Sequence, residues 1–134
     1  MPPTRVLIVA HRTAATPRLL ERVRARAGRE ACAFTLLVPR NYWDPDTDET
    51  SATLELALPL LEEAAGGHVE GRVGDSDPFQ AVKEALEGGA YDEVLISTLP
   101  ERVSHWLRRD LPHRVSGLGV RVDVVTAAGR EERD

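Results

Sequence analysis

The chain has 134 residues, of which 42% are hydrophobic and 29% charged, so we expect one folded domain rather than two domains or a disordered chain. The net charge of −5 hides an asymmetry, because residues 1–40 carry eight basic and two acidic residues, whereas residues 41–100 carry fourteen acidic and two basic ones. The acidic middle of the chain argues against wrapping a polyanion, so nucleic acid is not an expected partner.

Composition also indicates where in the cell the protein is located. No apolar run approaches the roughly 18 residues that span a bilayer, so we expect no membrane partner. The single cysteine, Cys32, cannot form an internal disulfide, which is typical of proteins in a reducing environment. We therefore expect a cytoplasmic protein.

Apolar runs and helical periodicities alternate along the first third of the chain. Residues 5–10 (RVLIVA) are a short apolar run, as expected of a strand covered on both faces. Thr16 and Pro17 then provide a capping hydroxyl and a first-turn proline for a helix, and Gly28 is its predicted end. Residues 32–39 (CAFTLLVP) are predicted to be a second buried strand.

The polar segment that follows, residues 39–50, is predicted to be a long loop. The neighbouring aromatic residues Tyr42 and Trp43 either form a lid or a partner contact, or fold back over the end of the sheet. A second helix is predicted over about 51–65, and Pro59 should kink it or shift its start.

Residues 68–74 (HVEGRVG) alternate in polarity and predict a strand at or near a sheet edge. Asp77 and Gln80 have the spacing of a capping box, which predicts a third helix ending at the glycine pair 88–89. Residues 93–98 (EVLIST) are predicted to be the fourth strand.

A second capping-box spacing, Thr98 to Glu101, predicts a fourth helix directly after this strand. Pro112 is its predicted end or a sharp bend. Residues 117–127 (GLGVRVDVVTA) are predicted to be the fifth strand. The buried stripe of the fourth helix is predicted to comprise Val103, Trp106, Leu107 and Leu111.

Five strands that alternate with four helices predict a single α/β domain with an ordered core over about 4–126. The sheet is expected to be open, parallel and five-stranded, with helices on both faces. Right-handed crossovers leave few topologies, and of these we predict the doubly wound strand order 3-2-1-4-5. This order places the first and fourth strands side by side where the winding reverses, which is the usual ligand site of such sheets.

Candidate ligand-binding residues follow from that topology. One hypothesis is that arginine side chains and the start of the fourth helix hold a phosphate or carboxylate there. The alternative is that Thr98 only caps the helix and the arginines lie in water. The candidate residues are His11, Arg12, Thr13, Val38, Ser97, Thr98 and Arg102.

Three segments together resemble the universal stress protein family, in a divergent actinobacterial-type form, over most of residues 4–126. They are VLIVAHRTAATPRLL, VEGRVGDSDPFQAVKEAL, and YDEVLISTLPERVSHWLRRDLP followed by GVRVDVV. The resemblance implies a Rossmann-like fold and a stress-response protein. In nucleotide-binding members it also implies an aspartate after the first strand and a glycine-rich loop after the fourth.

This chain departs from that nucleotide-binding pattern. His11 stands at the aspartate position and Ser97 at the first glycine position. Glycines let backbone amides approach phosphates, whereas Leu99 has a bulky side chain and Pro100 has no amide hydrogen to donate. A later Gly-Ser or Gly-Thr pair of the family falls near Asp110, whose carboxylate would repel a phosphate. We therefore expect no cofactor, with ATP disfavoured, although a small anionic ligand stays open as the alternative.

The sequence also argues against a catalytic site. His11 opposite Ser97 would resemble a base and its nucleophile, but Asp75, a candidate orienting acid, follows a strand two places away, and no Gly-x-Ser-x-Gly elbow exists. The four histidines lie on separate elements or face differently, so no metal is expected. We expect a protein that is not an enzyme, with weak nucleotide hydrolysis as part of the alternative.

The fifth strand predicts a homodimer. Two copies that pair antiparallel around Val122 would place Arg121 opposite the partner's Asp123 and Val120 opposite the partner's Val124. Opposite charges directly across strands contribute roughly 0.2–1 kcal/mol per pair. The resemblance implies dimerisation through the same strand.

Overall fold

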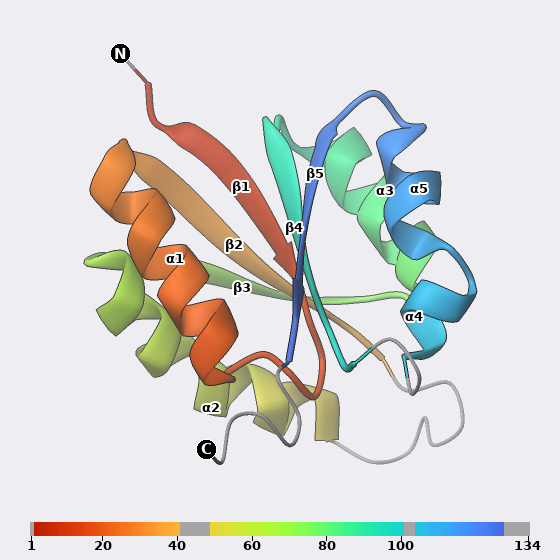
Figure 1. The fold of residues 1–134 in the computed structure, drawn as a ribbon, viewed down its shortest axis with the longest axis horizontal. Helices are drawn as coiled ribbons and strands as arrows, with labels where there is room; N and C mark the ends of the chain where they lie inside the picture. Colours follow the sequence, from red (N-terminus) through yellow and green to blue (C-terminus); the bar gives the residue numbers. More distant parts are fainter. Residues whose placement is uncertain (1, 41–48, 101–103, 128–134) are drawn as a thin grey trace.

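The computed structural model describes residues 2–40, 49–100 and 104–127. Its centre is a parallel sheet in the order β3-β2-β1-β4-β5, so the predicted fold class and strand order are confirmed (Figure 1). The strands are β1 (Thr4–Val9), β2 (Cys32–Pro39), β3 (Val69–Gly74), β4 (Glu93–Thr98) and β5 (Arg121–Thr126). The helices are α1 (Pro17–Arg29), α2 (Glu49–Ala65), α3 (Pro78–Gly88), α4 (His105–Arg108) and α5 (Leu111–Ser116).

Two hydrophobic cores lie on the two faces of the sheet. Helices α1 and α2 cover one face, whereas α3, α4 and α5 lie on the other (Figure 1). β1 supplies both cores because successive side chains of a strand point to opposite faces. Val6 and Ile8 belong to the α1/α2 core, whereas Leu7 and Val9 belong to the other. A strand buried on both faces requires a continuous apolar run, which explains the RVLIVA segment.

The predicted helix cap is confirmed for Asp77 and wrong for Thr16. Asp77 caps α3, because its Oδ1 accepts hydrogen bonds from Phe79 N at 3.0 Å and Gln80 N at 3.5 Å. Thr16 precedes α1 as predicted, but its hydroxyl makes no cap hydrogen bond. It donates instead to the carbonyl of Thr13 at 3.2 Å, so it stabilises the preceding turn rather than the helix.

Each of the first three helices ends at a glycine or within one residue of one. α1 runs one residue past the predicted end at Gly28. Gly66 follows α2 with a φ of +76°, a left-handed conformation that favours glycine. Gly88 ends α3 as predicted.

The segment after β4 differs most from its prediction. Helix α4 begins at His105 rather than beside Thr98, and Ser104 Oγ accepts a hydrogen bond from Leu107 N at 3.1 Å. Asp110 then takes a left-handed conformation with a φ of +59°. Pro112 lies in the first turn of α5 instead of ending the fourth helix. A proline is tolerated there because the first-turn amides have no partner within the helix.

The acidic helix α2 begins slightly earlier than predicted and continues through Pro59. Leu61 is buried, and Leu54 and Leu58 pack against the same core. The Tyr42–Trp43 pair and Arg102 lie outside the described residues. Across 2–40, 49–100 and 104–127, no helix combines the length and the apolar composition needed to cross a membrane.

Candidate functional site

The carboxyl ends of β1 and β4 meet where the winding of the sheet reverses, as predicted. Ser97 near the end of β4 and Thr13 in the turn after β1 are both buried, with exposed fractions of 1% and 3%. The Ser97 hydroxyl donates to Thr13 Oγ1 at 2.7 Å. This hydrogen bond joins two segments that are 84 residues apart, so it links the β1 turn directly to β4. We call residues 11–13 with Ser97 and Thr98 the strand-end site.

Thr98 supports the backbone around this site. Its hydroxyl donates to the carbonyl of Leu99 at 2.8 Å, and its own carbonyl accepts from the backbone amide of Ala127 at 2.8 Å. Thr98 therefore does not cap a helix, contrary to the prediction. It fixes the path of the chain after β4 and anchors the end of β5.

The other candidate residues are placed differently. His11 is half-buried and Arg12 is exposed, both in the turn that follows β1. Val38 is fully buried in the α1/α2 core, so it packs within that core and offers no atoms to a ligand. The structure brings Thr13 and Ser97 together and leaves Arg12 in solvent.

This geometry bears on the chemistry of Ser97. A serine nucleophile needs a base that accepts its proton. The Ser97 hydroxyl has two acceptors on Thr13, Oγ1 at 2.7 Å and the carbonyl oxygen at 3.4 Å, and neither is basic. Within the described residues, no group of three or more histidine, cysteine or acidic side chains is arranged to hold a metal ion.

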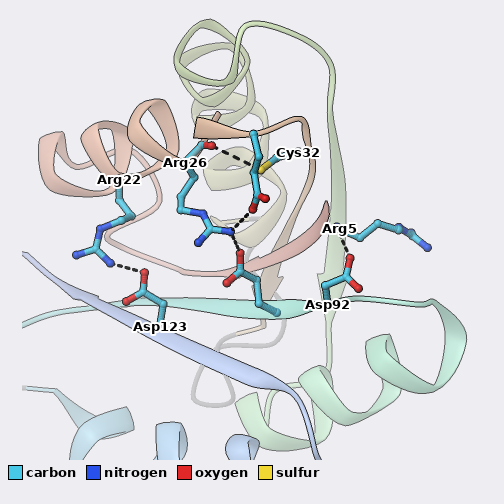
Figure 2. Close-up of polar contacts among 8 residues, drawn as sticks. Arg5, Arg22, Arg26, Cys32, Asp92 and Asp123 are labelled. Carbon is cyan, nitrogen blue, oxygen red and sulfur yellow. Dashed lines mark hydrogen bonds and ion pairs between the residues drawn. The ribbon is translucent and has the colours of Figure 1, made fainter. Parts of the chain in front are cut away.

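A second polar cluster lies at the opposite, amino-terminal end of the strands (Figure 2). Arg26 of α1 forms an ion pair with Glu93, the first residue of β4. The same guanidinium contacts Glu30 at 3.2 Å. The Glu93 side chain is only 5% exposed, so its charge is balanced by Arg26 rather than by water.

Arg22, one turn earlier on α1, forms an ion pair with Asp123 of β5 (Figure 2). Asp123 is therefore on the face of β5 that α1 covers, and it already has a cationic partner within the same chain. Arg121 is exposed, whereas Val120 and Val122 pack partly against the core on the other face.

Cys32 lies beside this cluster, with its Sγ 3.8 Å from the carbonyl oxygen of Arg26. Burial raises the pKa of the Cys32 thiol, and the positive charge of Arg26 opposes that increase. The thiol is therefore less ionised at neutral pH than that of an exposed cysteine.

Neither ion pair was predicted from the sequence, although signals for both existed. Arg22 and Arg26 are four residues apart and so share one side of a helix, next to the buried stripe of Leu19 and Val23. Glu93 begins a strand that is otherwise buried and mostly apolar. A buried acidic residue needs a partner, and a row of arginines on a covering helix can supply it.

Comparison with known proteins bears on the fold. No protein-family model matches the chain, and the search of curated proteins found no relative. A universal stress protein crystallised in complex with cAMP is similar to this structure, with a TM-score of 0.65 and 17% identity over 96% of this chain and 100% of that one.

Two further solved structures are similar. A universal stress protein from Archaeoglobus fulgidus has a TM-score of 0.62 and 13% identity over 92% of each chain. A lipopolysaccharide core biosynthesis protein from Thermoplasma volcanium GSS1 has a TM-score of 0.50 and 14% identity over 95% of this chain and 98% of that one. The first two similarities show that the chain has the fold of the universal stress proteins.

Proposed function

We propose that this protein is a non-catalytic, homodimeric universal stress protein-like module whose strand-end site does not hold ATP in the way that the glycine-containing members of the family do. The observation that carries the proposal is the buried hydrogen bond from Ser97 to Thr13. It occupies polar groups at the place where phosphate oxygens would otherwise find donors.

The backbone around Ser97 supports the same conclusion. A phosphate cradle consists of successive backbone amides that point at the ligand. Pro100 has no amide hydrogen. Helix α4 begins only at His105 and has four residues, so its macrodipole is weak and starts several residues past the end of β4.

A second candidate function is the binding of a nucleotide or another small anion. It is favoured by the cAMP complex of a protein with the same fold, and by Arg12, which is exposed beside the strand-end site. A guanidinium can bind a phosphate through two parallel hydrogen bonds. According to this second hypothesis, Arg12 rather than a glycine-rich loop provides the main contact to the anion.

The homodimer part of the proposal rests on β5. This strand pairs with β4 along one edge, and among the described strands none pairs with its other edge. An open edge strand rich in valine is prone to add another strand. A carboxylate can accept more than one guanidinium, so Asp123 can keep Arg22 and also receive Arg121 from a partner.

Isothermal titration calorimetry tests the two functions against each other. Wild-type protein is titrated with ATP, AMP, cAMP and inorganic phosphate to millimolar concentration, and the proposal expects no binding heat for any of them. Arg12→Ala and Arg29→Ala are matched variants, because both remove an exposed arginine and Arg29 lies at the far end of α1.

Binding that is lost in Arg12→Ala and kept in Arg29→Ala would contradict the proposal and establish the second candidate. A Ser97→Gly variant adds a gain-of-function arm, because it removes the hydrogen bond to Thr13 and introduces the residue that nucleotide-binding members carry. If either protein binds a nucleotide, the proposal expects Ser97→Gly to bind it at a lower nucleotide concentration than wild type does.

A further inference from the structure

The outer face of α2 is unusually apolar for a helix face in contact with water. Leu56 is 74% exposed and Leu60 is 44% exposed. The exposed positions of the helix repeat at intervals of three and four residues, so they form one continuous stripe along its length. We call this stripe the α2 ridge; its members are Ala52, Glu55, Leu56, Pro59, Leu60 and Glu63.

The composition of the ridge indicates what kind of surface covers it. A solvated helix face normally carries charged and polar residues, but four of the six ridge positions are apolar. The charged members, Glu55 and Glu63, are both acidic, and α2 has no basic residue at all. A complementary surface is therefore basic, with room for two leucine side chains.

The neighbouring helix of the same chain has these properties. α1 lies beside α2 on the same face of the sheet (Figure 1). Its exposed side carries Arg18, Arg24 and Arg29 against one acidic residue, Glu21, and it also includes the small residues Ala25 and Gly28. The space over Gly28 is open, because a Cβ placed there would meet nothing within 4 Å.

We propose that two copies of this chain associate through the α1/α2 face, with the α2 ridge of each copy seated on α1 of the other. A two-fold axis that runs between the two helices, parallel to them, produces this arrangement, and the same contact then forms twice. Leu56 and Leu60 of one copy then lie on the exposed face of its partner's α1, among the arginines of that helix. This contact is separate from the β5 edge.

Charge decides against the simpler pairing of one α2 ridge with another. That arrangement would bury the leucines equally well, but it would bring Glu55 and Glu63 of both copies together, and like charges across an interface are unfavourable. In the described residues, none of Arg24, Arg29, Glu55 and Glu63 has an ion-pair partner in its own chain. All four side chains are available to the partner copy.

The size of the face sets the strength of the association. At a rise of about 1.5 Å per residue, helices of 13 and 17 residues are about 20 and 26 Å long. Two such helices, each about 10 Å wide, offer roughly 400–500 Å² of flat area. Stable interfaces bury about 800 Å² per partner, so this association is weak and dissociates on dilution.

Sedimentation velocity over a concentration series tests the proposal with charge-reversed variants of the full chain. Variant A, Glu55→Arg with Glu63→Arg, makes the ridge basic. Variant B, Arg24→Glu with Arg29→Glu, makes α1 acidic. Each variant alone should lose self-association through this face, because like charges then oppose each other.

An equimolar mixture of A and B should associate again, since both contacts in a mixed pair then join opposite charges. Loss of folding cannot produce that recovery. Glu84→Arg with Glu87→Arg is the matched control, because it makes the same charge change at exposed positions of α3 on the opposite face of the sheet, and it should leave self-association unchanged.

All chains are also measured with Arg121→Glu added, which should weaken β5 pairing and changes no residue of α1 or α2, so failure of the β5 dimer and failure of this contact are distinguishable. Recovery in the mixture supports the proposal. No recovery, or the same loss in the α3 control, would overturn it.

Discussion

The guanidinium of Arg26 and the carboxylate of Glu93 form an ion pair between α1 and the first residue of β4, with side chains that are 12% and 5% exposed. Arg26 also contacts Glu30 at 3.2 Å, but the Glu30 side chain is 51% exposed. One arginine thus has a buried and an exposed acidic partner.

This pair of partners allows a matched test of burial. Glu93→Ala should lower the free energy of unfolding by about 3–5 kcal/mol, because it leaves the mostly buried charge of Arg26 without its main partner. Glu30→Ala should cost no more than about 1 kcal/mol, since exposed ion pairs contribute little. Urea unfolding with unchanged m-values measures both. Equal costs would contradict this account.

The proposed β5 dimer gives a second prediction. Arg121→Glu should weaken the dimer, because it places two acidic residues opposite each other across the strands. Arg22→Ala is the control, because it removes the partner that Asp123 has within its own chain and leaves Arg121 intact. Analytical ultracentrifugation should show a larger loss of dimer for Arg121→Glu, and the reverse order would refute the antiparallel register around Val122.

The two helix starts give a third prediction. Asp77→Ala should destabilise the protein by about 0.5–2 kcal/mol, because it removes the cap hydrogen bonds of α3. Thr16→Ala should cost less, since the Thr16 side chain makes no cap hydrogen bond. Thermal or urea unfolding of the two variants compares them directly. A larger loss for Thr16→Ala would contradict this ranking of the two side chains.

Two glycines of β3 give a fourth prediction. A Cβ at Gly74 would lie 2.8 Å from the Cβ of Ala81, and that atom cannot rotate away. Gly74→Ala should therefore cost about 1–3 kcal/mol through overpacking. A Cβ at Gly71 would be as close to Leu58, but only to the terminal Cδ1, so Gly71→Ala should cost less. Urea unfolding distinguishes the two.

Cys32 gives a prediction with a pH dependence. Because burial raises the pKa of its thiol, the midpoint of the pH profile for iodoacetamide alkylation should lie above that of the unfolded chain, about 8.5. The folded state then holds the proton more tightly, so this group adds stability below that pH and loses it as the pH rises further. A midpoint at or below the unfolded value would contradict the pKa shift.

The sheet could be predicted from the sequence because each strand carries its own signal. The strands β1, β2 and β4 are buried on both faces and read as apolar runs, and the helices between them force parallel pairing. Crossover handedness then leaves few topologies, and the doubly wound order predicted from among them is the one that the structure has. The Asp77 cap could be predicted as well, because a capping residue and the amides it binds are within three residues of each other.

The region after β4 could not be predicted in the same way. A proline fits either the end of one helix or the first turn of the next, so Pro112 alone does not decide between one helix and two. The hydrogen bond from Ser97 to Thr13 and the ion pair from Arg22 to Asp123 join residues 84 and 101 positions apart. Such contacts depend on the packed structure, and local spacing does not encode them.

The two outer edges of the sheet are unlike each other, and this difference limits how far strand addition can proceed. Besides two valines, the β3 edge carries Glu70, Arg72 and two glycines, which are poor residues for templating a new strand, whereas β5 carries three valines and no glycine. If both edges recruited neighbours, copies would join head to tail into an open-ended filament. A single recruiting edge closes on itself after two copies, so the proposed β5 pairing cannot extend the sheet strand by strand into a fibre.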